Sequence, residues 1–311
     1  MNKKINNWID TLSLTNHFEF YSSFFRIFIC IYILASLYNY WDFFPIIFSG
    51  KSFYLAEPTY LLETFGINSS IIRDHINLYI FVYVILVGLF ALGIGRHYTA
   101  LLLFAFFEIS QRLCYVVLNG GDNLLKFCLM YMIFVDSYQY FAIRKTNSSG
   151  LKANKIRIFV SNLAGYLICF HLCLVYFFSA FHKIHADVWY NGIATYYTLS
   201  LERFKGTRFN NSLALSGVFV TLSTYFVLIV ELSYPYLIWN KKTRPYIIFS
   251  AVLMHVGIFF FMMIYGFQIV FIAIQGFFIP NQTWINFYNI LTNKIQLFSK
   301  KKLFTVFNSF L

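Results

Sequence analysis

Residues 176–192 read YFFSAFHKIHADVWYNG, and the rest of the chain is interpreted outward from this stretch. An aromatic, apolar helix face ends here in a cluster of titratable side chains, which an indole and a glycine turn follow: His182, Lys183, His185, Asp187, Trp189 and Gly192. Ionisable residues are costly to place at the edge of an apolar span, so they indicate either function or a buried ion pair. Residues 182–189 are therefore the first candidate for a functional site.

The composition predicts an integral membrane protein. Hydrophobic residues make up 59% of the 311 residues, charged residues make up 12%, and the mean hydropathy is +0.64. Soluble domains carry about twice that share of charged residues. The many Phe and Tyr residues fit side chains that settle at the two membrane interfaces.

The pattern of apolar segments predicts an all-α fold. A membrane-spanning helix needs about 20 predominantly apolar residues. We predict about eight transmembrane helices in a polytopic bundle, at residues 23–42, 77–95, 97–117, 123–143, 159–181, 217–239, 246–264 and 267–280. Residues 1–22 are expected to form an amphipathic N-terminal segment, residues 23–280 the transmembrane domain, and residues 281–311 a basic cytoplasmic tail.

The net charge of +12 is explained by membrane topology, and no nucleic-acid partner is expected. With both termini in the cytoplasm, fifteen lysines and arginines fall on the cytoplasmic side and three fall within spans. Only six fall outside, namely Lys51, Arg73, Lys183, Arg203, Lys205 and Arg208. This distribution follows the positive-inside rule and places residues 182–189 on the outer face. The long outer segment 43–77 is expected to cover a cavity there.

Three further residues are candidates to line that cavity. Asp122 and Lys126 are four apart and share one helix face, and Gly120 and Gly121 before them would let a ligand approach the backbone. The same turn also fits a helix N-cap, with Asp122 or the next residue accepting backbone N–H groups. His255 lies mid-helix among Phe and Met, where it fits either a cavity wall or a satisfied core position.

Two acids within the spans have a structural interpretation. Asp136 and Glu231 lie near the cytoplasmic halves of their predicted helices. A buried carboxylate needs a cationic partner, and the predicted partners are Arg26 and Arg96.

Metal binding and disulfide formation are not expected. His182 and His185 are three apart, which is acceptable for two imidazoles on one helix turn, but with Asp187 they make only a weak metal motif. The five cysteines all lie within apolar runs, so we expect buried thiols.

The motif residues resemble a known family, the horizontally transferred transmembrane (HTTM) domain proteins, which include the membrane domain of the vitamin K-dependent gamma-carboxylase. In that family an aromatic-rich helix leads into a lysine, then Ala-Asp, Trp and Gly, and the corresponding residues here are Lys183, Asp187, Trp189 and Gly192. Other segments agree in order and spacing: GIGR at 93–96, NGGDN at 119–123, FVD at 134–136 and the helix around His255. The resemblance covers roughly residues 20–280.

The resemblance implies a role for each motif residue. Lys183 falls on the lysine that serves in the carboxylase as the catalytic base, where it deprotonates vitamin K hydroquinone before oxygen and carbon dioxide react. The implied cofactor is reduced vitamin K or menaquinol, which would enter from the bilayer, and no metal is implied. The side chains expected to line the cavity are Asp122, Lys126, His182, His185, Asp187, Trp189 and His255.

The chain also departs from the carboxylase pattern. His182 replaces a second lysine, Val188 is an additional residue before Trp189, and Gly120 and Gly121 replace an Asn-His pair. The carboxylase carries a large non-membrane domain that holds its protein substrate, for which this chain has no room. Quinol deprotonation is therefore expected ahead of carboxylation of a protein.

Two functions remain open. One is an enzyme that uses Lys183 to deprotonate a lipid-soluble quinol, in oxygen-dependent carboxylase-like or epoxidase-like chemistry. The other is a non-enzymatic membrane partner in the maturation or export of a secreted peptide, resembling the protein that helps to mature a sporulation-delaying toxin. The bias towards Ile, Asn, Lys and Phe is typical of AT-rich bacterial genomes, so the bacterial plasma membrane is the expected location.

Overall fold

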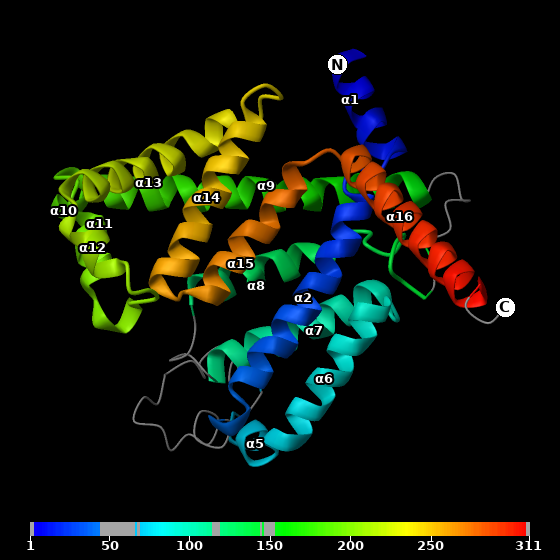
Figure 1. The fold of residues 1–311 in the computed structure, drawn as a ribbon. Helices are drawn as coiled ribbons and strands as arrows, with labels where there is room; N and C mark the ends of the chain where they lie inside the picture. Colours follow the sequence, from blue (N-terminus) through cyan, green and yellow to red (C-terminus); the bar gives the residue numbers. More distant parts are fainter. Residues whose placement is uncertain are drawn as a thin grey trace.

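The computed structural model describes residues 3–43, 66, 69–113, 119–143, 145 and 153–308, and it contains no β-strand among them (Figure 1). The first half of the chain forms α1 (Lys3–Leu14), α2 (Glu19–Asn39), η1 (Trp41–Phe43), α5 (Ser69–Asp74), α6 (Ile76–Leu92), α7 (Arg96–Leu113) and α8 (Gly120–Met132). The second half forms α9 (Ala153–Ile184), α10 (Asp187–Tyr190), α11 (Ala194–Ser200), η3 (Glu202–Phe204), α12 (Asn210–Leu215), α13 (Gly217–Leu237), α14 (Arg244–Met262), α15 (Tyr265–Ile274), η4 (Gln275–Phe278) and α16 (Asn281–Asn308). The all-helical prediction is therefore confirmed for the described residues.

Four helices are long and apolar enough to cross a membrane: Glu19–Asn39, Asn154–Ile184, Gly217–Leu237 and Arg244–Met262. Their outward faces carry large apolar side chains. Leu222, Ile229 and Phe249 are 66%, 65% and 68% exposed. Apolar surface of this kind on adjacent helices indicates a face that meets lipid rather than water.

The structure does not confirm eight spans, although each of the eight predicted segments contains a helix. Ile76–Ala91 and Tyr265–Phe278 are apolar but shorter than the four candidates. The predicted span 123–143 is interrupted, because α8 has 13 residues and reaches only about 20 Å, whereas the hydrocarbon core is about 30 Å thick. Past its end, the Asp136 backbone N–H donates to Ser161 Oγ of α9 at 2.9 Å, so the chain leaves the helix to bond to its neighbour.

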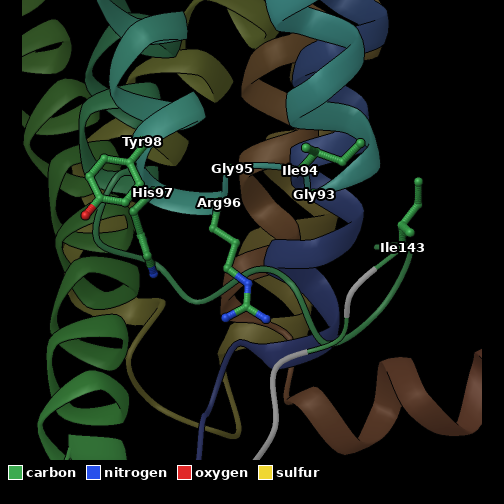
Figure 2. Close-up of a pocket in the computed structure, with 7 residues that line it drawn as sticks. All are labelled: Gly93, Ile94, Gly95, Arg96, His97, Tyr98 and Ile143. Atoms are coloured by element: carbon green, nitrogen blue, oxygen red, sulfur yellow. The ribbon is translucent and has the colours of Figure 1, made fainter.

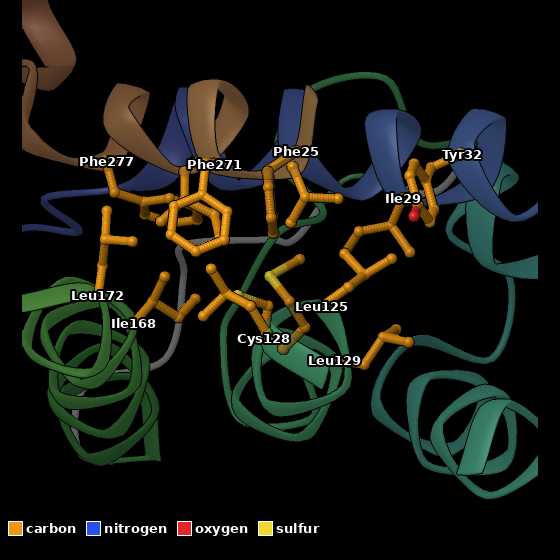
Figure 3. Close-up of a cluster of buried hydrophobic side chains, with 14 of the residues drawn as sticks. Phe25, Ile29, Tyr32, Leu125, Cys128, Leu129, Ile168, Leu172, Phe271 and Phe277 are labelled. Atoms are coloured by element: carbon orange, nitrogen blue, oxygen red, sulfur yellow. The ribbon is translucent and has the colours of Figure 1, made fainter. Parts of the chain in front are cut away.

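The apolar core lies between two layers of helices (Figure 3). Side chains of α2 and α15 face side chains of α8 and α9, and the central ones are at most 3% exposed: Phe25, Ile29, Leu125, Leu129, Ile168, Leu172 and Phe271. Lipid tails are as apolar as Leu, so helices in a bilayer associate through close packing rather than through the hydrophobic effect. This cluster supplies that packing at the centre of the array.

Arg26 of α2 is fully buried beside this core. Its Nη1 atom donates to the carbonyls of Phe90 and Ala91, each at 2.7 Å, and its Nη2 atom donates to those of Tyr140 and Phe141 at 3.1 and 2.7 Å. The last carbonyls of a helix lack partners within the helix. Arg26 donates hydrogen bonds to these carbonyls at the end of α6. It also holds the bend at residues 140–141 against α2.

Four cysteines, Cys30, Cys128, Cys169 and Cys173, are buried free thiols, as predicted. The fifth, Cys114, lies outside the described residues, as do residues 44–65 of the predicted cover.

Candidate functional site

Lys183 lies in the last turn of α9 and forms an ion pair with Glu231 of α13, whose Oε1 atom accepts from Nζ. The lysine side chain is 22% exposed and the glutamate side chain 8% exposed. Trp189, just beyond the end of α9, adds a cation–π contact, with Nζ 4.9 Å from the centre of its ring. Two helices that pack along each other are therefore joined at this point by a charged pair in a mostly apolar setting.

The Glu231 carboxylate is only half satisfied. Its Oε2 atom is buried and has no hydrogen-bond partner among the residues that the structure describes, whereas Oε1 is bonded to Lys183. Buried polar atoms in folded proteins nearly always have a partner, so an exception needs an explanation. A proton or a hydroxyl group delivered by a ligand would supply the missing partner.

A chain of buried hydrogen bonds lies beside this pair. Tyr234 donates to Gln275 Oε1, Gln275 Nε2 donates to Tyr176 at 3.1 Å, and Tyr176 lies 2.7 Å from His255 Nε2. His255 Nδ1 lies against Gln268 Oε1, which can only accept. The proton of the imidazole is therefore assigned to Nδ1, and Nε2 accepts from Tyr176. Both ring nitrogens of His255 have partners, which is the arrangement of a satisfied core histidine.

The ion pair and the hydrogen-bond chain share the same two helices. Lys183 follows Tyr176 by seven residues on α9, and Glu231 precedes Tyr234 by three residues on α13. At about 1.5 Å per residue, the ion pair lies about 5 to 10 Å along the helix axes from the two tyrosines of the hydrogen-bond chain. The two tyrosine rings pack with centroids 4.3 Å apart. The ion pair and the two tyrosines thus occupy one continuous part of the α9–α13 interface, and the chain of hydrogen bonds continues from the tyrosines to η4 and α14.

Three of the predicted site residues lie close to Lys183 in the sequence, but they are on the surface and not in the ion pair. His182, His185 and Asp187 are exposed. His185 Nδ1 lies 2.7 Å from the carbonyl of Phe181. No group of three His, Cys, Asp or Glu side chains that could hold a metal ion occurs in the part of the chain that the structure describes.

Asp122 and Lys126 make other contacts. Asp122 accepts from the Tyr32 hydroxyl at 2.7 Å and from the Asn119 backbone N–H at 3.0 Å, and Asn119 is the N-cap of α8. Lys126 pairs with Glu108 of α7 at 3.3 Å. Within the described residues, no hydrogen bond or ion pair joins either residue to Lys183. The N-cap interpretation of the turn is confirmed, with Asn119 as the capping residue.

The two glycines of this turn serve helix packing. A Cβ atom on Gly120 would lie 2.7 Å from the Phe267 ring, and one on Gly121 would lie 2.7 Å from Phe267 Cα. The prediction that a ligand approaches this backbone is therefore wrong, because the start of α15 fills the space.

The predicted partners of the buried acids are wrong. Glu231 pairs with Lys183, and Asp136 pairs with Arg157 Nε at 3.1 Å, whereas Arg26 binds backbone carbonyls. Arg96 Nη2 donates to the Lys145 carbonyl at 3.1 Å. Sequence reasoning therefore missed Glu231 as a site residue. The signal that could have found it is a single carboxylate within the apolar run 217–237.

Two hollows in the described structure lie away from Lys183. One, of about 660 Å³, is lined by residues 93–98 and Ile143, around the turn between α6 and α7 (Figure 2). The other, of about 490 Å³, lies between the start of α2, α9, the α13–α14 connection and the start of α16. Neither borders the Lys183–Glu231 pair.

No family model, curated protein or solved structure matches this chain. The resemblance to HTTM domain proteins therefore rests on the motif residues quoted above, and function has to be argued from the geometry around Lys183.

Proposed function

We propose that this chain is a membrane-embedded, HTTM-type protein in which the Lys183–Glu231 pair takes a proton from a lipid-soluble quinol, reduced menaquinone or vitamin K hydroquinone. The observation that carries this proposal is the buried cross-helix pair in which Glu231 Oε2 lacks a partner. The residues suit such a group, because Oε2 can accept from a hydroxyl and Trp189 offers an aromatic face beside Lys183 Nζ.

The geometry of the pair allows proton transfer, because Lys183 Nζ donates directly to Glu231 Oε1. Transfer of one proton from Lys183 Nζ to Glu231 leaves an amine with a free lone pair. That amine then accepts a proton from outside the protein and becomes an ammonium again, while Glu231 keeps the first proton. A deprotonated quinol reacts with oxygen, which is the chemistry that the bound group would supply.

The proposal includes a finer membrane arrangement than four spans. It has eight membrane segments, both termini in the cytoplasm of a bacterial cell, and Lys183 at the outer face of the plasma membrane. The excess of Lys and Arg in the segments assigned to the cytoplasm supports this orientation.

The test is oxygen uptake and quinone epoxide formation by the detergent-purified protein supplied with reduced menaquinone or vitamin K. Lys183→Ala should lower turnover about 100-fold or more, which is the range for loss of a general base. Glu231→Gln should also lower turnover, because the amide cannot receive the lysine proton. Lys126→Ala is the matched control, since it removes the lysine of another cross-helix Lys–Glu pair.

A second comparison separates catalysis from stability. Lys183→Met alone leaves the Glu231 charge buried without a partner, which typically costs about 3–5 kcal/mol. The double variant Lys183→Met/Glu231→Leu should recover most of that stability, measured as the thermal midpoint in detergent, yet remain inactive. If folded wild-type protein turns over none of several quinols, the proton-acceptor proposal is wrong.

The alternative function would then lead, namely a membrane partner in the maturation or export of a secreted peptide. In that case the Lys183–Glu231 pair would serve only to join α9 to α13.

A further inference from the structure

The hollow of about 490 Å³ lies against the middle of α9, away from Lys183 in its last turn. Its wall includes Tyr166, which precedes Lys183 by 17 residues on α9, a separation of about 25 Å along the helix. The start of α2, the α13–α14 turn and the start of α16 lie together at the top of Figure 1 and supply the rest of the wall. The end of α13 and the starts of α14 and α2, three of the four helices long and apolar enough to cross a membrane, therefore meet here.

The hollow is electropositive. Lys241 and Arg244 line it, and none of the described residues that line it is acidic. Lys241 forms no ion pair with any described carboxylate. Arg244 donates through Nε to the Ile238 carbonyl at 2.9 Å and through Nη2 to the Trp239 carbonyl at 3.3 Å. These bonds hold the guanidinium at the end of α13 without neutralising it.

The remainder of the wall is aromatic and amide-bearing. The Trp239 ring is 43% exposed and packs on Phe278, with ring centroids 5.7 Å apart. Asn281 Oδ1 accepts from the Phe20 backbone N–H at 2.9 Å, which leaves its Nδ2 hydrogens to donate to a ligand. Tryptophan is enriched where membrane and water meet, because its ring is apolar and its N–H is polar.

We propose that this hollow binds the glycerophosphate headgroup of an anionic phospholipid. Lys241 and Arg244 pair with the phosphate, Asn281 donates to a glycerol oxygen, and Trp239 and Phe278 contact the first apolar atoms of the lipid. Basic pockets between membrane helices on the cytoplasmic side are suited to such headgroups. A lipid is favoured over a soluble anion because the cations and the exposed indole lie where membrane-crossing helices end.

The test is native mass spectrometry of protein that has been stripped of lipid in mild detergent. Phosphatidylglycerol and phosphatidylcholine with identical acyl chains are titrated separately, and inorganic phosphate is titrated in a third series. We expect phosphatidylglycerol to bind more tightly than phosphatidylcholine, and Lys241→Gln to weaken its binding about fivefold, the effect of about one surface cation. Lys242→Gln is the matched control, because it removes the same charge from the next residue, which does not line the hollow.

Three results would overturn the proposal. These are equal binding of the two lipids, equal phosphatidylglycerol binding by Lys241→Gln and wild-type protein, or inorganic phosphate binding as tightly as the lipid. Lys241 is exposed, so its replacement leaves the fold intact. Arg244→Lys keeps the charge, and it should retain more phosphatidylglycerol binding than Arg244→Gln.

Discussion

At the scale of single residues, two buried or partly buried cations of this apolar protein find their partners in different ways. Arg26 is matched by four backbone carbonyls, whereas Lys183 is matched by one carboxylate and one indole. The first arrangement binds both terminal nitrogens of the guanidinium to fixed backbone acceptors, so it is structural. The second leaves Glu231 Oε2 without a hydrogen-bond partner among the described residues, and the proposed function uses this pair as the proton acceptor.

Replacement of Arg26 is expected to destabilise the protein strongly. Arg26→Gln removes the guanidinium, so the carbonyls of Ala91, Tyr140 and Phe141 lose its donors, at an expected loss of roughly 3 kcal/mol or more. The measurement is the thermal unfolding midpoint in detergent. Arg208→Gln is the control, since Arg208 is exposed and its loss should change stability by no more than about 0.5 kcal/mol. Equal midpoints for the two variants would show that the carbonyl contacts contribute little.

His17 predicts a pH dependence of stability. Burial lowers the pKa of His17 below its ordinary value, and its Nδ1 atom lies 2.9 Å from the Tyr166 hydroxyl. The neutral form is favoured in the folded state, so the stabilisation is complete above about pH 6.5 and is lost as the pH falls towards the lower folded-state pKa. Wild-type protein in neutral detergent should therefore lose more stability between pH 7.5 and pH 5 than His17→Gln. An identical loss in both proteins would contradict the assignment.

Residue chemistry was predictable from the sequence only in part. Lys183 stands out because a titratable cluster follows an apolar helix. Its partner Glu231 does not, because the two are 48 residues apart and only the packing of α9 on α13 brings them together. Asp136 was assigned to the wrong arginine for the same reason.

At the scale of helices, close approach depends on small residues. Gly120 and Gly121 open α8, and Phe267 of α15 occupies the space that their missing side chains leave. In a membrane, small residues at a helix contact allow backbones to approach and gain packing energy. The first turn of α8 is thus shaped by its neighbour.

Gly121→Ala should weaken this contact. The added Cβ atom would lie 2.7 Å from Phe267 Cα, which is backbone and cannot swing away. Overpacking of this kind typically costs about 1–3 kcal/mol. Gly88→Ala provides the control, since a Cβ atom there has no neighbour within 4 Å and alanine favours the helix by up to about 1 kcal/mol. Unfolding midpoints that move in the same direction for both variants would refute the packing argument.

The positions of the helices were predictable, because most of them coincide with long apolar runs in the sequence. Helix ends were not, as α8 and α9 show. The predicted span 123–143 treats the residues after Met132 as helix because they are apolar, but their backbone bonds to α9 and to Arg26 instead. The helix α9 extends beyond the predicted span 159–181, because the polar turns at both of its ends are helical as well.

At the scale of the whole molecule, α9 passes through both candidate sites, the Lys183–Glu231 pair and the hollow of about 490 Å³. It contains 32 residues and is about 48 Å long, whereas the hydrocarbon core measures about 30 Å. Lys183 and Tyr166 are 17 residues apart on this helix, about 25 Å along its axis, which is close to the thickness of the core. The two candidate sites can therefore lie near opposite surfaces of a bilayer.

Cysteine labelling from the two sides of the membrane tests this orientation. In a Cys114→Ser background the other four cysteines are buried and should not react with a membrane-impermeant maleimide. We expect Arg208→Cys to be labelled in intact cells and Lys242→Cys only after the membrane is opened. Labelling of both positions from the same side would refute the proposed topology.

The way in which Arg26 is bound has a consequence for how the sequence can change over time. Its acceptors are the backbone oxygens of residues 90, 91, 140 and 141, and every amino acid carries such an oxygen. The residues at these four positions can be substituted without the loss of a hydrogen bond to Arg26. Among homologues the arginine should therefore persist without a covarying acid, and methods that infer contacts from paired substitutions would overlook one of the most buried charges in the protein.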